Sequence, residues 1–143
     1  RFIPIVMIAA FRPHYMRRVL AALEACDGIH DTVLVVSQDG SDPEVTAAIQ
    51  GLTALPVVHL HHPTAMFGVL EPLRGVLEAL FPRVVAQNVI GTAPVGFNAR
   101  HTMSFAFDAL HAPAAIYIEE DIQPAPTFLR FFTLSYDLLA NTT

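Results

Sequence analysis

The sequence predicts an α/β domain built on a mostly parallel sheet with helices on both faces. Apolar runs of strand length alternate with segments of helical spacing, in the order β-α-β-α-β-(loop, α)-β-α. This alternation along one chain is typical of a parallel sheet between layers of helices. The apolar runs are largely continuous, as in strands buried on both faces. Of the 143 residues, 53% are hydrophobic and 15% charged, so 1–143 can form one domain with a substantial core.

The first strand and the first helix are the clearest elements. The first strand is expected in the continuous apolar run "FIPIVMIAA", 2–10. Pro13 fits the first turn of the helix that follows, and Gly28 closes that segment. The apolar residues of this helix recur at helical spacing: Tyr15, Val19, Leu23 and Cys26.

The second strand is expected at 32–40, "TVLVVSQDG", which ends in a polar turn. Either Ser41 or Asp42 can cap the helix in "PEVTAAIQGL", because both side chains accept backbone N–H bonds. Pro43 stands at the start of that helix and Glu44 in its first turn, where both are favourable.

The middle of the chain begins with a third strand, "LPVVHLHHP" at 55–63, which ends in polar residues. The stretch 64–97 mixes Gly and Pro with apolar residues, so we expect a short helix at 73–80 and loop elsewhere. Asn98 is expected to cap a helix that continues to about Leu110.

The last two elements are a fourth strand in "AAIYIEED", 114–121, and a helix in "PTFLRFFTLSYDLLAN", introduced by Pro126. The chain shows no signal peptide and strand-like sequence starts beside Arg1, so we expect it to be part of a longer protein.

Composition and the absence of certain motifs argue against several classes of function. The net charge is −5, and no basic cluster exceeds the pair Arg17 and Arg18, so no nucleic-acid partner is expected. No apolar run approaches the ~20 residues of a membrane span, so no membrane segment is expected. The turn "AAFRPH" is neither a GxGxxG fingerprint nor a P-loop, which argues against NAD enzymes and P-loop NTPases.

Polar groups follow each of the four predicted strands. Parallel sheets bind ligands at the carboxyl ends of their strands, so these groups are expected at one binding edge. In strand order they are Arg12, then Ser37, Gln38 and Asp39, then His59, His61 and His62, and finally Glu119, Glu120 and Asp121.

The three contiguous acids suit a hard cation such as Mg²⁺ or Mn²⁺, which is commonly held by one or two carboxylates and by substrate phosphates. Strand alternation predicts that Glu119 and Asp121 point one way and Glu120 the other. The acids are explained equally well by a solvated turn before the next helix, because a negative charge near a helix N-terminus stabilises the helix by about 0.3–1 kcal/mol.

Arg12 and Asp39 could each bind a ligand, but each also fits a purely structural or surface role. Arg12 precedes a helix start, where an anion would meet free N–H groups and a guanidinium, but it also fits an exposed surface position. Asp39 can accept from a base imide or a ribose hydroxyl, whereas Asp-Gly is also a strong turn former.

The remaining candidates are histidines and one cysteine. Strand alternation places His59 and His61 on one strand face, where they could share a metal site. The three histidines His59, His61 and His62 lack a ligand set such as HExxH, so structural or exposed roles are expected for them. His101, near the start of a predicted helix, could stack on a base or be structural. Cys26 has no adjacent base and no disulfide partner within the chain, so it is expected to be a packed core thiol.

Five segments follow one another along the chain: "IPIVMIAAFRPHYMRRVLAAL", "VLVVSQDG", "VVHLHHP", "NARHTMSFAFDAL" and "AAIYIEEDIQPAPTFLRFF". In this order they resemble the donor-binding half of the N-acetylglucosaminyltransferase I family, the alpha-1,3-mannosyl-glycoprotein 2-beta-N-acetylglucosaminyltransferases. The resemblance covers most of the chain but is weak over 64–97. It implies a Rossmann-like glycosyltransferase type A fold, a single nucleotide-sugar-binding domain, and a Golgi location on the lumenal side of the membrane.

The resemblance also implies a ligand set: UDP-GlcNAc as donor, a mannose-containing glycan as acceptor, and Mn²⁺ or another divalent cation. By resemblance, Asp121 holds the metal, Glu119 and Glu120 face the sugar and ribose, and Arg12 lies near the phosphates. Asp39 and His101 match the uracil-binding aspartate and histidine of the family. The family's catalytic base would lie beyond Thr143, so the chain alone is expected to bind the donor weakly without transferase activity.

The chain departs from the family at three places. The family triplet is Glu-Asp-Asp, whereas Glu120 stands in the middle here. The family has Cys-Asp where this chain has Ala10 and Phe11, and Cys where it has Gly40, so a linking disulfide is missing. Such losses also suit a second interpretation, a non-catalytic sugar- or protein-binding domain of the same fold. A third is another metal-assisted phosphoryl-transfer domain.

Overall fold

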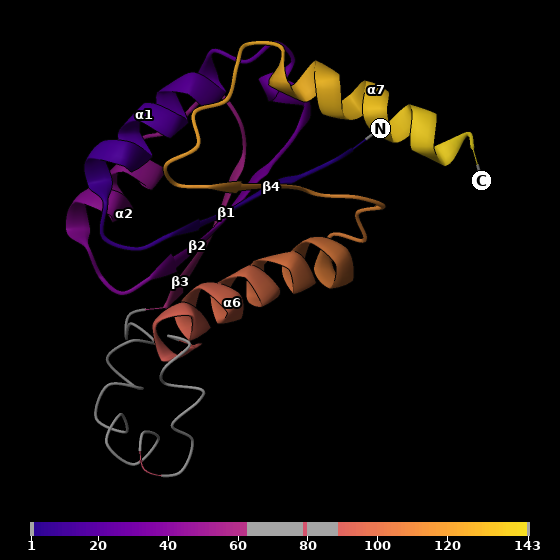
Figure 1. Ribbon diagram of the computed structural model, residues 1–143. Coiled ribbons are helices and arrows are strands. Elements are labelled where there is room, and N and C mark those ends of the chain that lie inside the picture. Colours follow the sequence, from indigo (N-terminus) through magenta and orange to yellow (C-terminus); the bar gives the residue numbers. More distant parts are fainter. Residues whose placement is uncertain (1, 63–78, 80–88, 143) are drawn as a thin grey trace.

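The computed structural model describes residues 2–62, 79 and 89–142, with side chains from residue 96 onward in the last of these ranges. The described residues form one four-stranded parallel sheet of order β3-β2-β1-β4 (Figure 1). Its strands are β1 (Ile5–Ala9), β2 (Leu34–Asp39), β3 (Val57–His62) and β4 (Ile116–Glu119). The predicted α/β class with a parallel, Rossmann-like sheet is therefore confirmed.

The register places the carboxyl ends of the strands side by side. Ile8 of β1 pairs with Ser37 of β2 on one side and with Glu119 of β4 on the other. Ser37 in turn pairs with Leu60 of β3. Because all four strands run in the same direction, the turns that follow them share one edge of the sheet.

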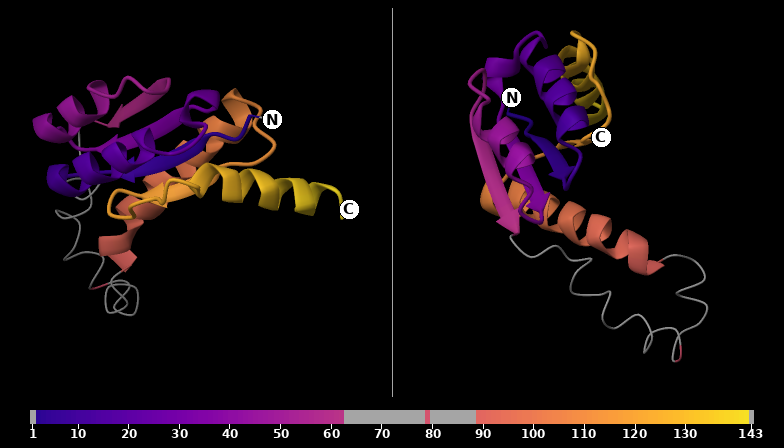
Figure 2. Two further views of the ribbon diagram at one scale, coloured as in Figure 1. Left: turned by 90° about the horizontal axis from the view of Figure 1, so that it is seen from above. Right: turned by 90° about the vertical axis from the view of Figure 1, so that its left-hand side faces the viewer.

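Helices cover both faces of the sheet, as predicted. One face carries α1 (Pro13–Glu24), α2 (Pro43–Gln50) and α7 (Phe128–Ala140), and the other carries α6 (Val89–Ser104), which a π-helical turn extends through Phe105–Ala109 (Figures 1 and 2). The larger core joins strand residues such as Met7 and Val36 to α1, α2 and Leu129 of α7. The smaller core joins Val6 and Val35 to Ala106, beyond the end of α6.

The starts of α1 and α2 follow the sequence signals. Pro13 and Pro43 occupy the first helical turn of α1 and α2 respectively. Of the two predicted caps for α2, Asp42 is the one used: its Oδ1 accepts from the N–H of Glu44 at 2.9 Å and of Val45 at 3.1 Å. The turn after β2 is thereby fixed by local hydrogen bonds.

The prediction for α6 was wrong at its start. The helix begins at Val89, so the loop expected over 89–97 is helical and Asn98 lies inside the helix rather than capping it. The buried Asn98 side chain accepts from Ser37 Oγ at 2.9 Å and so does not compete with the helix backbone. Intrinsic helix propensity is only a weak prior, so the Gly and Pro of this stretch do not prevent a helix. His101 accordingly lies in the last turn of α6, not near its start.

Two smaller points concern helices elsewhere. Tyr15 is 39% exposed, and Met16 and Leu20 instead join Val19 and Leu23 on the buried side of α1. The expected helix at 73–80 lies outside the described residues except for Ala79. None of the helices within the described ranges is both long and apolar enough to cross a membrane.

Helix α7 has apolar side chains on two opposite sides. Leu129 is buried against the core, with Phe128 and Tyr136 packed beside it. Phe131, Leu134 and Leu138, at helical spacing on the other side, are 63%, 54% and 71% exposed. Figure 2 shows α7 running along the domain with its C-terminal end extending away from the sheet.

Candidate functional site

The side chain of Arg12 links the ends of β1 and β4. Its Nε donates to Oε1 of Glu120 at 2.7 Å, and its Nη1 donates to Oδ2 of Asp121 at 3.0 Å. The other oxygen of Glu120, Oε2, accepts the backbone N–H of Ala10 at 3.0 Å. In the sequence Arg12 lies 108 positions before Glu120 and 109 before Asp121, and the fold brings it into direct contact with both acids.

The two acids of this cluster differ in solvent exposure. The Glu120 side chain is 5% exposed, whereas those of Asp121 and Arg12 are 35% and 42% exposed. The hydrogen bond to Glu120 is the main cause that raises the pKa of Arg12, with the charges of Glu120 and Asp121 adding to it against the effect of burial. Arg12 is therefore firmly cationic, at a position where one acid is buried and the other faces solvent.

Glu119 ends β4 and is exposed, whereas Glu120 and Asp121 lie in the turn after the strand, so strand alternation does not continue through the triplet. Glu120 is buried and Asp121 is not, yet both bond to Arg12. Burial raises the pKa of Tyr117, and the nearby charge of Glu119 raises it further. Glu119 therefore projects into solvent beside the strand rather than joining the contacts of Arg12 that the structure describes.

Gln38 organises the turn after β2 from a fully buried position. Its Oε1 accepts from Thr46 Oγ1 at 3.0 Å and pairs with His59 Nε2 at 2.9 Å, and its Nε2 donates to the carbonyl of Asp42 at 3.1 Å. Burial, with a smaller effect of His61, lowers the pKa of His59, which favours a neutral ring here. The amide of Gln38 thus joins β2, β3 and α2 just before Asp39.

A second set of bonds holds the same turn to the end of β3. Gly40 adopts a left-handed φ of 85°, its N–H donates to the carbonyl of His62 at 2.8 Å, and its carbonyl accepts from His61 Nε2 at 3.0 Å. The rings of His59 and His61 lie 5.5 Å apart, which confirms that they share one strand face. The position of Asp39 is therefore fixed by bonds on both sides of it.

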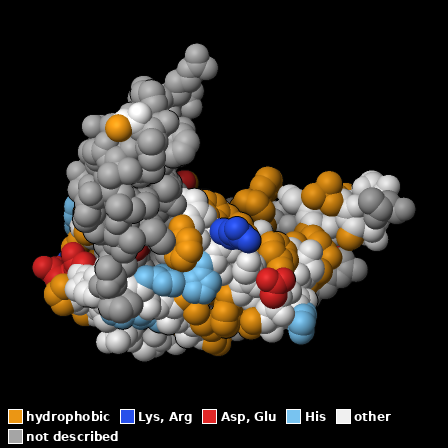
Figure 3. Space-filling model, turned by 90° about the horizontal axis from the view of Figure 1, so that it is seen from below, with side chains coloured by type: hydrophobic (Ala, Val, Ile, Leu, Met, Phe, Trp, Pro, Cys, Tyr) orange, Lys and Arg blue, Asp and Glu red, His pale blue; other side chains and the backbone are white. Residues whose placement is uncertain are grey.

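His101 meets His62 across the edge of the sheet. His101 Nδ1 lies 2.9 Å from His62 Nε2, and the two ring centroids are 4.7 Å apart. Burial and the neighbouring His101 lower the pKa of His62, while Asp39 opposes that change. Asp39, His62 and His101 therefore form a second group, and Figure 3 shows histidine side chains gathered on this face of the molecule.

The predicted site residues thus form two groups on one edge. Arg12, Glu120 and Asp121 surround the ends of β1 and β4, whereas Asp39 and His101 lie near the ends of β2 and β3. β1 and β2 are neighbours, with Ala9 paired to Gln38, so the two groups follow adjacent strands.

Sequence reasoning missed three contributions to these groups. The Ala10 N–H and the Ser37–Asn98 bond depend on partners that are distant in the chain. The contact of His62 with His101 likewise depends on the path of α6. The only available signal was that Ser37 and His62 belong to the polar groups that follow the strands.

The Asp121 carboxylate suits a divalent cation whose other ligands would come mainly from a bound substrate. Its carboxylate is one-third exposed at the ligand edge, and Mg²⁺-type ions commonly take one or two carboxylates plus phosphate oxygens. Within the part of the chain that the structure describes, no three His, Cys, Asp or Glu side chains converge on a metal position.

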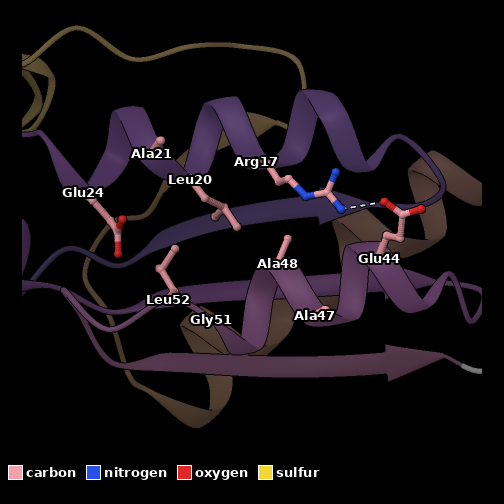
Figure 4. A pocket seen from close by; sticks show the side chains of 9 residues that line it. All are labelled: Arg17, Leu20, Ala21, Glu24, Glu44, Ala47, Ala48, Gly51 and Leu52. Atoms are coloured by element: carbon pink, nitrogen blue, oxygen red, sulfur yellow. Dashed lines mark hydrogen bonds and ion pairs between the residues drawn. The ribbon is translucent and has the colours of Figure 1, made fainter.

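A groove elsewhere in the molecule contains none of the predicted site residues. It lies between α1 and α2 and is lined mainly by small and apolar residues, with the Arg17–Glu44 ion pair at 2.6 Å at one end (Figure 4). Its nine lining residues are Arg17, Leu20, Ala21, Glu24, Glu44, Ala47, Ala48, Gly51 and Leu52.

A scan against protein-family models finds no matching family, and a search of curated proteins finds no match either.

Proposed function

We propose that this chain is the donor-binding domain of a metal-dependent N-acetylglucosaminyltransferase that binds UDP-GlcNAc with Mn²⁺ or another divalent cation. The observation that carries the proposal is the contact between Arg12 and Asp121 at the carboxyl edge of a parallel sheet. It supplies one cationic and one anionic group, side by side and both partly exposed, as a diphosphate with its counter-ion requires.

Each residue then has a role in holding the donor. Asp121 holds the cation, and Arg12 contacts the diphosphate oxygens. Asp39 and His101, near the ends of the neighbouring strands, receive the uracil, and Glu119 faces the sugar from the exposed end of β4. When bound, the cation neutralises the charge that develops on the leaving diphosphate.

The proposed reaction is transfer of GlcNAc to a mannose hydroxyl with inversion at the anomeric carbon. Arg12 adds a second positive charge beside the departing diphosphate, in a position that its bond to Glu120 already fixes. Proton removal from the acceptor needs a carboxylate or similar base on the acceptor side, and no residue of this chain is assigned to it.

A second candidate is a non-catalytic sugar- or protein-binding domain of the same fold. The observation in its favour is that Arg12, Glu120 and Asp121 already pair with one another, as in a purely structural ion cluster. In that case nucleotide binding would be absent, or would not depend on a cation.

Titration calorimetry of the folded chain with UDP-GlcNAc, with and without Mn²⁺, tests the proposal. We expect measurable binding only when the cation is present, and weaker binding of ADP than of UDP. If a sample with a native circular dichroism spectrum gives no cation-dependent heat, the donor-binding proposal fails and the non-catalytic candidate is preferred. Equal affinity for ADP and UDP would instead favour the phosphoryl-transfer interpretation.

A further inference from the structure

Glu120 is the one member of the acid triplet that the structure buries. Its side chain is 5% exposed, and both of its carboxylate oxygens are engaged by the chain itself. Oε1 accepts from Arg12 Nε, and Oε2 accepts from the N–H of Ala10. The Glu120 carboxylate therefore binds the turn after β1 at two residues, Ala10 and Arg12.

Because of these two contacts, both carboxylate oxygens of Glu120 already accept a hydrogen bond from the chain and are poorly available to a ligand. A direct bond to a ribose or sugar would require a buried carboxylate to give up a charge-assisted bond of 2.7 Å or a backbone bond of 3.0 Å. Buried charged groups that lose their partners are strongly unfavourable. Glu120 is thus better placed to act on Arg12 than on the donor.

Arg12 is held differently at the two ends of its guanidinium. Nε bonds to the buried Glu120, whereas Nη1 bonds to Asp121, which is 35% exposed. These bonds use two of the five N–H donors of the group, and the side chain as a whole is 42% exposed. The terminal nitrogens can therefore exchange partners while Nε stays in place.

We infer that Glu120 is a positioning residue that anchors Arg12 through Nε, so that the Nη end alternates between Asp121 and a phosphate group of the ligand. The identity of that ligand as a nucleotide diphosphate rests on the function proposed above, but the anchoring itself does not. The class of ligand is an anionic phosphate ester or pyrophosphate that binds with a divalent cation.

This arrangement couples the binding of the anion to that of the cation. When the Nη end of Arg12 moves to a phosphate, it leaves Asp121 with a carboxylate oxygen to offer a cation. When Asp121 turns to a cation, it leaves Arg12 free for the phosphate. Each ligand favours the arrangement that the other needs, so each should raise the affinity for the other by the same factor.

The first test observes Arg12 without any ligand. In ¹⁵N NMR spectra the Nε–H signal, assigned by its loss in Arg12→Lys, should exchange slowly with water because Glu120 is buried. The signal should exchange rapidly or disappear in Glu120→Gln, and it should remain slow in the control Glu24→Gln, an exposed acid at the last residue of α1. Slow exchange retained in Glu120→Gln would overturn the inference.

The second test measures pyrophosphate binding by calorimetry, with and without Mn²⁺. Glu120→Gln and Arg12→Lys should each weaken pyrophosphate binding by about tenfold, as is typical when a positioning partner is lost, and the double variant should be no weaker than either. Glu24→Gln should change it by less than about twofold. If Glu120→Gln proves unfolded, Glu120→Asp, which keeps the charge but is shorter, should show the same loss.

The outcomes separate this inference from the proposed function. Pyrophosphate has no ribose, so a Glu120→Gln variant that weakens UDP binding but not pyrophosphate binding would assign Glu120 to the ribose and overturn the inference. Absence of pyrophosphate binding by the unsubstituted chain would overturn it as well. If UDP-GlcNAc fails to bind while the Nε–H and pyrophosphate results hold, the anchoring stands and the donor assignment fails.

Discussion

His101 Nδ1 and His62 Nε2 lie 2.9 Å apart, so one of these two nitrogens carries the hydrogen and donates a hydrogen bond to the other when both rings are neutral. Protonation of both rings would place two donors and two positive charges in contact. The pair joins the last turn of α6 to the end of β3.

Stability should fall in mild acid because of His62. Burial and His101 lower the pKa of His62 in the folded chain, so the unfolded chain binds protons more readily. The contribution of His62 is complete above the unfolded value of about 6.5 and is lost as the pH falls from there toward the lower folded pKa. His59, whose pKa is also lowered by burial, acts in the same direction.

Urea unfolding at pH 5.5 and 7.5 measures this effect. The difference in free energy of unfolding between the two pH values should be smaller in His62→Gln than in the unsubstituted chain. His14→Gln, an exposed histidine on α1, should leave the difference unchanged. An undiminished pH dependence in His62→Gln would contradict the prediction.

Gln38→Ala should lower the free energy of unfolding by about 2–3 kcal/mol, because it removes a fully buried amide and deprives Thr46, His59 and the Asp42 carbonyl of a partner. Urea unfolding measures the change. Gln50→Ala is the matched control on an exposed position of α2 and should stay within about 0.5 kcal/mol. A small effect at Gln38 would mean that water replaces the lost bonds.

Ser37→Ala should destabilise the fold by about 1–3 kcal/mol, because it removes the donor that faces the buried Oδ1 of Asn98. Since this bond joins β2 to α6, amide hydrogen exchange in the last turn of α6 should also become faster. Ser104→Ala, at the exposed end of α6, serves as the control for both measurements. Unchanged exchange around His101 would show that other contacts hold α6 in place.

Asp121→Asn should weaken the cation-dependent binding of UDP-GlcNAc by at least about tenfold, the usual cost of disturbing a metal site. It should change the free energy of unfolding by less than about 1 kcal/mol, because its ion pair with Arg12 is partly exposed. Calorimetry and urea unfolding measure the two quantities.

Asp31→Asn is the matched control for that substitution. It removes the same charge from an exposed position before the start of β2, at the opposite edge of the sheet. Its binding of UDP-GlcNAc should be unchanged. Equal losses in Asp31→Asn and Asp121→Asn would point to a general effect of charge instead of a site at Asp121.

The features that sequence reasoning predicted well are local ones. Pro13, Pro43 and Asp42 act within a few residues of their own positions, so the helix starts followed directly from residue type. The continuous apolar strands and the polar groups after them predicted the parallel sheet and the gathering of polar side chains where its strands end. These signals need no knowledge of which strands become neighbours.

The features that it missed depend on contacts between distant segments. Asn98 has the chemistry of a cap, and only the passage of α6 across Ser37 gives its side chain a different partner. Alternation placed Glu120 opposite its two neighbours, but whether that side is buried depends on β4 pairing with β1. The pairing of Arg12 with two of the acids likewise requires the folded turn after β1.

The outward side of α7 has a practical consequence for every measurement described above. Phe131, Leu134 and Leu138 present a hydrocarbon surface to the buffer, and excluded salts such as sulfate strengthen the tendency of such surfaces to leave water. Concentrated samples for spectroscopy should therefore precipitate at modest ammonium sulfate concentrations. Leu134→Lys together with Leu138→Glu should raise that salting-out point while leaving the sheet intact.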